Sequence, residues 1–233
     1  MYDKKNLSKK IALAIAINVL AIVIPFNTTY AGPGGAIEPA VSTGITIVPL
    51  DQQAVPQALR HEAKLALIQM KSRGYVDATE DEVSYLDRAK EDKHKRLKPM
   101  IDVAPKLKLS PANLGSSSLS QAVLLGATAN GGHTAEGWTG LTRIFALPKL
   151  GLVGLNEVDY VASKGGMAFI KEAINQSVNG YAAILSVKQS RSGKGLTELT
   201  WATDRKIYTL STNSALKNQT SIDEFMAIAR GIF

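Results

Sequence analysis

The chain lacks cysteine altogether. This absence excludes thiol catalysis, thiolate zinc sites and iron–sulfur clusters, because each of these requires cysteine sulfur. It also excludes disulfide bonds, which exported proteins with small cores commonly need. The fold therefore depends on packing, and a chain of 233 residues is long enough to bury a substantial core.

Histidine is scarce as well, and the chain contains only His61, His94 and His133. His133 could meet Glu136 in the loop GGHTAEGW, but a metal site requires three or four ligands and the sequence supplies no others. The motifs HExxH and GxSxG are absent, and RSGKGLT lacks the spacing of a phosphate-binding loop. We therefore predict no metal, no cofactor and no catalytic residue.

The first 31 residues predict a cleaved signal peptide. The basic head consists of Lys4, Lys5, Lys9 and Lys10. The apolar run Ile11–Ile24 then has fourteen residues, fewer than the roughly 20 that span a bilayer. Small residues follow at the positions that a signal peptidase recognises, Thr29 and Ala31. We expect cleavage between Ala31 and Gly32, export to the periplasm or the medium, and no transmembrane segment in the mature chain.

The net charge is modest once the signal peptide is set aside. The whole chain carries Lys+Arg 27 and Asp+Glu 20, and residues 1–31 hold four of the lysines and one aspartate. The mature chain therefore has 23 cations against 19 anions, a net charge of +4. This balance does not call for a nucleic-acid partner.

Residues 32–137 are expected to form a leader followed by a helical region. The leader, residues 32–56, is rich in Gly and Pro, and its segment GITIV predicts one short strand. The segment Gln57–Arg73 has apolar residues at helical spacing and ends at Gly74, so we predict a helix there.

A capping box of Thr79 and Glu82 predicts a second helix, which runs to Lys98 and stops before Pro99. Its apolar stripe is thin, so we expect much of this helix to face water. The stripe consists of Val83, Leu86, Ala89 and Leu97. Residues 100–137 are irregular in pattern, with one short helix expected near Leu119–Leu125.

Residues 138–233 predict a sheet domain closed by a helix. Six strands are expected, at 140–148, 151–162, 167–178, 181–189, 196–203 and 206–212. Asn179-Gly180 is a strong hairpin signal, because both residues tolerate the positive φ of a tight primed turn. Ser221 is expected to cap the final helix. The predicted fold class is α+β: N-terminal helices, then an antiparallel β-meander of about six strands with the C-terminal helix packed on it.

Trp201 and Tyr208 flank the short break Asp204-Arg205. A two-residue loop there places Trp201 opposite Tyr208 and Leu199 opposite Leu210, with all four on one face. Such an aromatic pair serves either as a structural pin for the strand register or as a platform on which a ligand stacks. Together with Tyr181, these two residues are the predicted ligand- or partner-binding residues.

The order of these C-terminal features resembles the extracytoplasmic β-domains of some bacterial anti-sigma proteins and envelope lipoproteins, half-barrel sheets with a C-terminal helix. The resemblance rests on Asn179, Gly180, Trp201, Tyr208 and the helix from Ser221. It implies a domain that binds partners or apolar ligands, or regulates signalling, without being an enzyme.

Three functions follow as hypotheses. The first is an exported, non-enzymatic binding or regulatory module of the bacterial cell envelope with a protein partner. The second is a carrier of lipid or another apolar ligand on the concave sheet face near Trp201, Tyr208 and Tyr181. The third is a hydrolase with dispersed catalytic residues, for which Glu157 and Asp159 share one face of a predicted strand.

Overall fold

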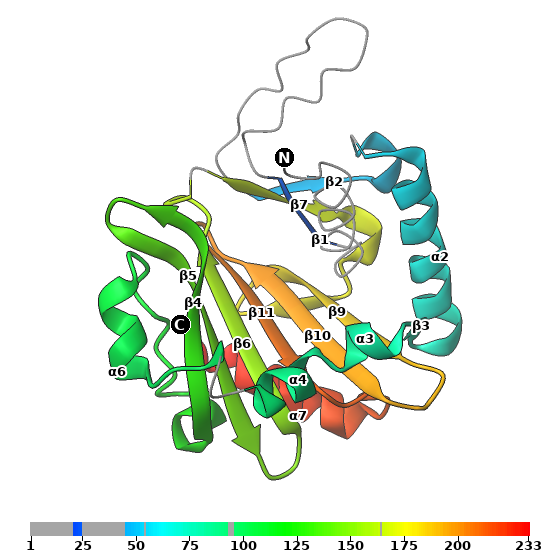
Figure 1. The fold of residues 1–233 in the computed structure, drawn as a ribbon. Helices are drawn as coiled ribbons and strands as arrows, with labels where there is room; N and C mark the ends of the chain where they lie inside the picture. Colours follow the sequence, from blue (N-terminus) through cyan, green and yellow to red (C-terminus); the bar gives the residue numbers. More distant parts are fainter. Residues whose placement is uncertain (1–20, 25–44, 54, 93–95, 164) are drawn as a thin grey trace, which may run out of the picture.

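The computed structural model describes residues 21–24, 45–53, 55–92, 96–163 and 165–233 (Figure 1). The predicted cleavage site, most of the predicted leader and His94 lie outside these residues. Within the described part of the chain, eight strands form one large sheet and three form a smaller one. Both sheets and the helices that flank them are visible in Figure 1.

The strand order of the large sheet is β3, β9, β10, β11, β6, β5, β4. An eighth strand, β8, also pairs with β9. These strands are β3 (Val76–Asp77), β4 (Val123–Thr134), β5 (Gly137–Leu147), β6 (Gly151–Asp159), β8 (Gln176–Val178), β9 (Tyr181–Gln189), β10 (Gly195–Ala202) and β11 (Lys206–Thr212). The small sheet consists of β1 (Ala21–Ile24), β7 (Gly166–Ile170) and β2 (Ile45–Val48), with β7 in the middle.

The helices precede, interrupt and follow the strands. Within the described residues the α-helices are α2 (Gln57–Arg73), α3 (Glu80–Val83), α4 (Tyr85–Glu91), α6 (Met100–Val103) and α7 (Gln219–Arg230). Four single turns of 3₁₀ helix are η1 (Leu50–Gln52), η2 (Ala104–Lys106), η3 (Ser118–Gln121) and η4 (Lys171–Ala173).

Apolar cores lie on both faces of the large sheet. Because side chains alternate along a strand, Leu199 and Leu196 point to opposite faces. Leu199 packs in the core that contains Phe225 of α7, whereas Leu196 packs with Leu86 of α4. A third core joins β7 of the small sheet to the end of the large sheet, where Ile207 lies. The structure thus confirms a mixed α and β fold with the C-terminal helix packed on the sheet.

The prediction of a purely antiparallel meander is wrong, because the sheets are mixed. β3 pairs with β9 in parallel, and β2 pairs with β7 in parallel. The single strand predicted at 167–178 is divided into two strands that belong to different sheets. Its first part is β7, in the small sheet, and after the 3₁₀ turn η4 its last part is β8, which pairs with β9 in the large sheet. Parallel pairing joins segments far apart in sequence, and no local turn signal announces it.

The hairpins of the large sheet agree with the sequence prediction. Asn179 and Gly180 have φ of 50° and 86°, as a primed turn requires, and β8 pairs with β9 across them. Trp201 pairs with Tyr208 and Leu199 with Leu210 in the predicted register. The chain closes that hairpin with a bond from the Thr203 N–H to the Lys206 carbonyl, 2.8 Å long.

β4 is the strand that the sequence pattern missed. A short helix was expected near Leu119–Leu125 and irregular structure after it, yet residues 123–134 form a strand of 12 residues paired with β5. The segment VLLGATANGGHT is rich in Gly, Ala and Asn, which disfavour strands in isolation. The backbone pairing with β5 therefore stabilises β4 as a strand, although its own composition does not favour one. The pairing shifts register at two places, and both contain glycines.

The helical predictions hold at the end of α2 and at the start of α3, and they fail within the predicted second helix and at the start of α7. α2 ends at Gly74, whose φ is 76°, and Thr79 with Glu82 forms the predicted capping box. The predicted second helix is interrupted at Ser84, which separates α3 from α4. Ser221 does not cap α7; Asn218 does, because its side chain accepts a hydrogen bond from the Ser221 N–H at 2.8 Å.

The thin apolar stripe of the predicted second helix packs against the large sheet. Val83, Leu86 and Leu97 are 1%, 0% and 7% exposed. They cover an apolar part of the sheet that includes Ile144 and Leu152. A few well-placed residues are therefore enough to hold this segment against the sheet.

Candidate functional site

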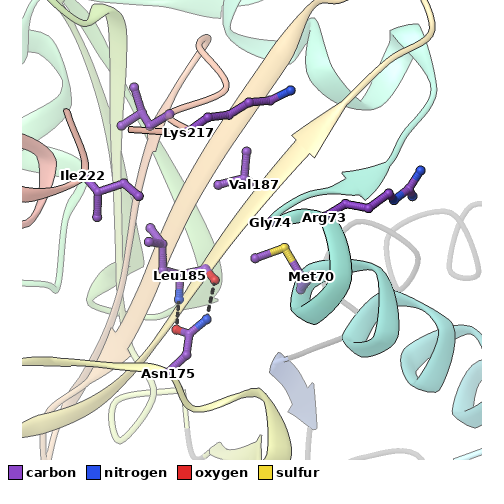
Figure 2. A pocket seen from close by; sticks show the side chains of 9 residues that line it. Met70, Arg73, Gly74, Asn175, Leu185, Val187, Lys217 and Ile222 are labelled. Carbon is purple, nitrogen blue, oxygen red and sulfur yellow. Dashed lines mark hydrogen bonds between the residues drawn. The ribbon is translucent and has the colours of Figure 1, made fainter. Parts of the chain in front are cut away.

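A pocket of about 230 Å³ lies where the end of α2, the middle of β9 and the start of α7 meet (Figure 2). Met70, on the α2 side, and Ile222, on the α7 side, lie on either side of Leu185 (Figure 2). The lining residues are Met70, Arg73, Gly74, Asn175, Leu185, Val187, Leu216, Lys217 and Ile222. Five of the nine are aliphatic or thioether side chains, so the walls are largely apolar.

The local sequence explains why the elements converge here. Gly74 adopts a left-handed conformation, and its N–H donates to the Met70 carbonyl, which ends α2 and turns the chain. The chain then forms β3, which pairs with Lys188 and Gln189 of β9. Since β8 pairs only with residues 181–183 of the same edge, the segment around Leu185 lies between β8 and β3.

Asn175 completes this edge of β9 with its side chain. Its Oδ1 accepts from the Leu185 N–H at 2.8 Å, and its Nδ2 donates to the Leu185 carbonyl at 2.9 Å (Figure 2). A single side chain thus takes the place of a neighbouring strand at Leu185. Because backbone groups alternate in direction along a strand, the N–H of Val187 is directed to the same side as that of Leu185.

Two cations stand at the mouth of the pocket. The Arg73 guanidinium pairs with Asp77 at 2.8 Å, and the Lys217 ammonium donates to the Gln189 amide oxygen at 2.7 Å. Both lie against the ring of Tyr75, with 4.8 Å from Arg73 Cζ and 4.3 Å from Lys217 Nζ to the ring centroid. The hydrogen bond to Asp77 raises the pKa of Arg73, so the guanidinium stays charged throughout the physiological range.

The lining of the pocket is apolar and cationic. None of its nine lining residues is a carboxylate, an imidazole or a hydroxyl, the groups that most often act as base or nucleophile. Apolar walls, one amide and two basic side chains can hold an apolar group that carries negative charge. Sequence analysis missed this site. The helix end at Gly74 and the apolar positions Met70 and Ile222 were its only local signals.

Two of the three predicted binding aromatics, Trp201 and Tyr208, lie in the core. Trp201 is 2% exposed and Tyr208 is 5% exposed, and their rings stack with centroids 5.0 Å apart. They pack in the core beneath α7, and Tyr181 lies half-buried on β9, two residues from Ala183, the cross-strand partner of Trp201. Burial, reinforced by the charge of Glu157, raises the pKa of Tyr208 to about 12. These contacts support the structural pin.

Glu157 belongs to a buried ionic cluster that sequence analysis did not foresee. Its side chain is 0% exposed and accepts from the Arg143 guanidinium at 2.7 Å, the Ala112 N–H at 2.8 Å and the Lys206 ammonium at 3.5 Å. Arg143 donates in turn to the Ala112 carbonyl, and Lys206 to the Ser110 carbonyl. The cluster fastens residues 110–112 to the sheet.

The other candidate side chains are also engaged. Asp159 pairs with Arg205 at 2.7 Å and accepts from the Ala162 N–H at 2.7 Å. Glu136 pairs with Lys108 at 3.1 Å. His133 packs edge-to-face on Trp138, and His61 is exposed on α2. In the described ranges, no three carboxylates or histidines lie together as metal ligands.

No family model matches the chain, and neither a curated protein nor a solved structure is similar to it. Among the helices that the structure describes, none combines the length and the apolar character needed to span a bilayer.

Proposed function

We propose that this protein is an exported, non-enzymatic binding module of the bacterial cell envelope, and that the pocket between α2, β9 and α7 receives an apolar group of a protein partner. The observation that carries the proposal is the pocket itself, with its apolar walls and without an acid–base group. Protein interfaces are commonly anchored by a few apolar side chains that enter such pockets.

The size of the pocket favours a side chain over a lipid. Its volume of about 230 Å³ is several times the roughly 30 Å³ that one water molecule occupies in the liquid. It is smaller than the about 300–1,000 Å³ of sites that bury a drug-sized ligand. One large side chain fills such a space. A membrane lipid, with two long chains, does not fit, although a short acyl group does.

A carrier of a small apolar ligand is the second candidate, because the same walls suit a short acyl chain. The two functions differ in what occupies the pocket in the cell. Native mass spectrometry of the protein purified gently from the envelope separates them. A bound small molecule lost on denaturation supports the carrier, and a co-purifying protein supports the module.

Site-specific crosslinking tests whether the pocket is the contact surface. A diazirine amino acid at position 70 is compared with the same amino acid at position 62, because Glu62 is exposed on α2 and does not line the pocket. We expect a discrete crosslinked protein from position 70 only, and its loss when Ile222→Trp fills the pocket. Equal crosslinking from both positions, or none from position 70, contradicts the proposed function.

A further inference from the structure

We infer that the partner enters this pocket by its C-terminus, with an apolar last residue in the pocket and the terminal carboxylate between Arg73 and Lys217. The inference rests on the proposed function and specifies the chemistry of the partner. It is carried by three features of the site: the excess of positive charge, the volume, and the backbone edge of β9.

The positive charge of Arg73 and Lys217 at the pocket favours an anionic ligand. The two lining cations and their hydrogen-bonded partners together include one carboxylate, that of Asp77, because the partner of Lys217 is the neutral amide of Gln189. Both cations contact the ring of Tyr75, with 4.8 Å from Arg73 Cζ and 4.3 Å from Lys217 Nζ to its centroid, so both charges lie around this one side chain. A carboxylate placed between them gains two charge-assisted hydrogen bonds, which are stronger than neutral ones.

The volume restricts what carries that carboxylate. An apolar group of the size of one side chain, attached directly to a carboxylate, fits the pocket of about 230 Å³ with its cationic mouth. In a polypeptide this combination occurs at the last residue, where the α-carboxylate and the side chain share one Cα. An internal Asp or Glu, by contrast, carries its charge on the side chain and brings no apolar group into the walls.

The edge of β9 suits a peptide that arrives in extended form. Asn175 already satisfies the N–H and the carbonyl of Leu185, so an incoming chain meets this edge beside Leu185, at Val187. The Val187 N–H is directed to the same side, toward the pocket. Chain ends are captured elsewhere by strand edges that supply backbone N–H groups together with an apolar pocket for the last side chain.

The incoming carboxylate has to compete with Asp77 for the Arg73 guanidinium, so a variant of Asp77 provides a control. Arg73 must share its guanidinium between Asp77 and the incoming carboxylate. Removing the charge of Asp77 while keeping its shape, in Asp77→Asn, should therefore strengthen binding. Exposed ion pairs contribute up to about 1 kcal/mol each, so we expect a gain of up to about fivefold.

The experiment uses the exported protein as purified from the envelope and twenty pools of fluorescent hexapeptides. Each pool has a fixed last residue and mixed residues before it, and binding is read as fluorescence anisotropy. We expect the pools ending in Leu, Ile, Val and Phe to bind most tightly. Amidation of the C-terminus should weaken them about twentyfold, because it removes the charge that both exposed cations recognise.

Matched variants locate the carboxylate. Arg73→Gln and Lys217→Gln should each weaken the best pool about fivefold, whereas Lys71→Gln, in the same last turn of α2 but outside the pocket, should leave it unchanged. All three side chains are exposed, so circular dichroism should show unchanged folding.

Three results would overturn the inference. The first is the lack of a preference for apolar last residues, and the second is equal binding of amidated and free peptides. The third is tight binding of octanoate with no binding by any peptide pool, which would assign the pocket to free acids. If crosslinking at position 70 persists while amidation has no effect, the proposed function stands and only the carboxylate contact fails.

Discussion

The substitution Glu157→Gln tests the buried ionic cluster. It removes the negative charge that Arg143 and Lys206 share and leaves both cations in place, with side chains only 9% and 14% exposed. Removing one partner of a buried ion pair costs about 3–5 kcal/mol, because the other charge stays buried without compensation. That cost is a large part of the roughly 5–15 kcal/mol that stabilises a typical domain.

Urea denaturation followed by circular dichroism measures this cost. We expect the midpoint to fall and the slope of free energy against urea to stay the same, as for a loss of stability without a change in compactness. In a heating experiment the loss corresponds to roughly 6–20 °C, at about 2–4 °C per kcal/mol for a protein of this size.

A double-mutant cycle provides the control. Arg143→Met combined with Glu157→Gln removes a buried cation together with the anion, so the double variant should be more stable than the sum of the two single losses implies. A loss below about 1 kcal/mol for Glu157→Gln would refute the reasoning, because it would show that the cluster behaves like a solvated surface pair. Additive losses would refute the coupling between the two residues.

Three further predictions follow. Because the folded-state pKa of Tyr208 is about 12, above the ordinary value of about 10, folding favours the protonated phenol; stability should fall as the pH rises from about 10 to 12, and urea titrations should show a smaller fall in Tyr208→Phe. Asn175→Ala removes two hydrogen bonds to Leu185 and should cost about 1–3 kcal/mol by urea denaturation, whereas unchanged stability would mean that water replaces the amide. Signal-peptide cleavage would remove β1, so amides of β7 should exchange faster by mass spectrometry in the processed protein than in a cleavage-blocked form; equal protection would contradict a role for β1 at that edge.

Local sequence signals predicted those elements whose determinants lie within a few residues. Gly74 ends α2 because glycine adopts the left-handed conformation without steric cost, and Asn179-Gly180 forms its turn for the same reason. The short break between Trp201 and Tyr208 was enough to set their register. Each of these predictions depends on backbone geometry that one or two residues control.

Elements stabilised by distant partners were mispredicted. β4 has a composition unfavourable for a strand, and only pairing with β5 makes it one. The chain from 167 to 178 has an apolar pattern that suits a single strand, but its first half pairs with β2 in the small sheet. Asn218 rather than Ser221 caps α7, because either residue type caps well and the Asn218 side chain accepts a hydrogen bond from the Ser221 N–H.

By itself, the sequence determined the absence of cysteine chemistry, the α and β character, the end of α2 and the hairpin around Trp201 and Tyr208. These follow from composition and from short-range backbone preferences. Only the tertiary structure decided that Met70, Leu185 and Ile222 enclose a pocket with Arg73 and Lys217 at its mouth. The physical reason is that the parallel pairing of β3 with β9 joins residues more than a hundred positions apart. The periodicity of a sequence predicts that a segment forms a strand, but it does not predict which other strand that segment pairs with.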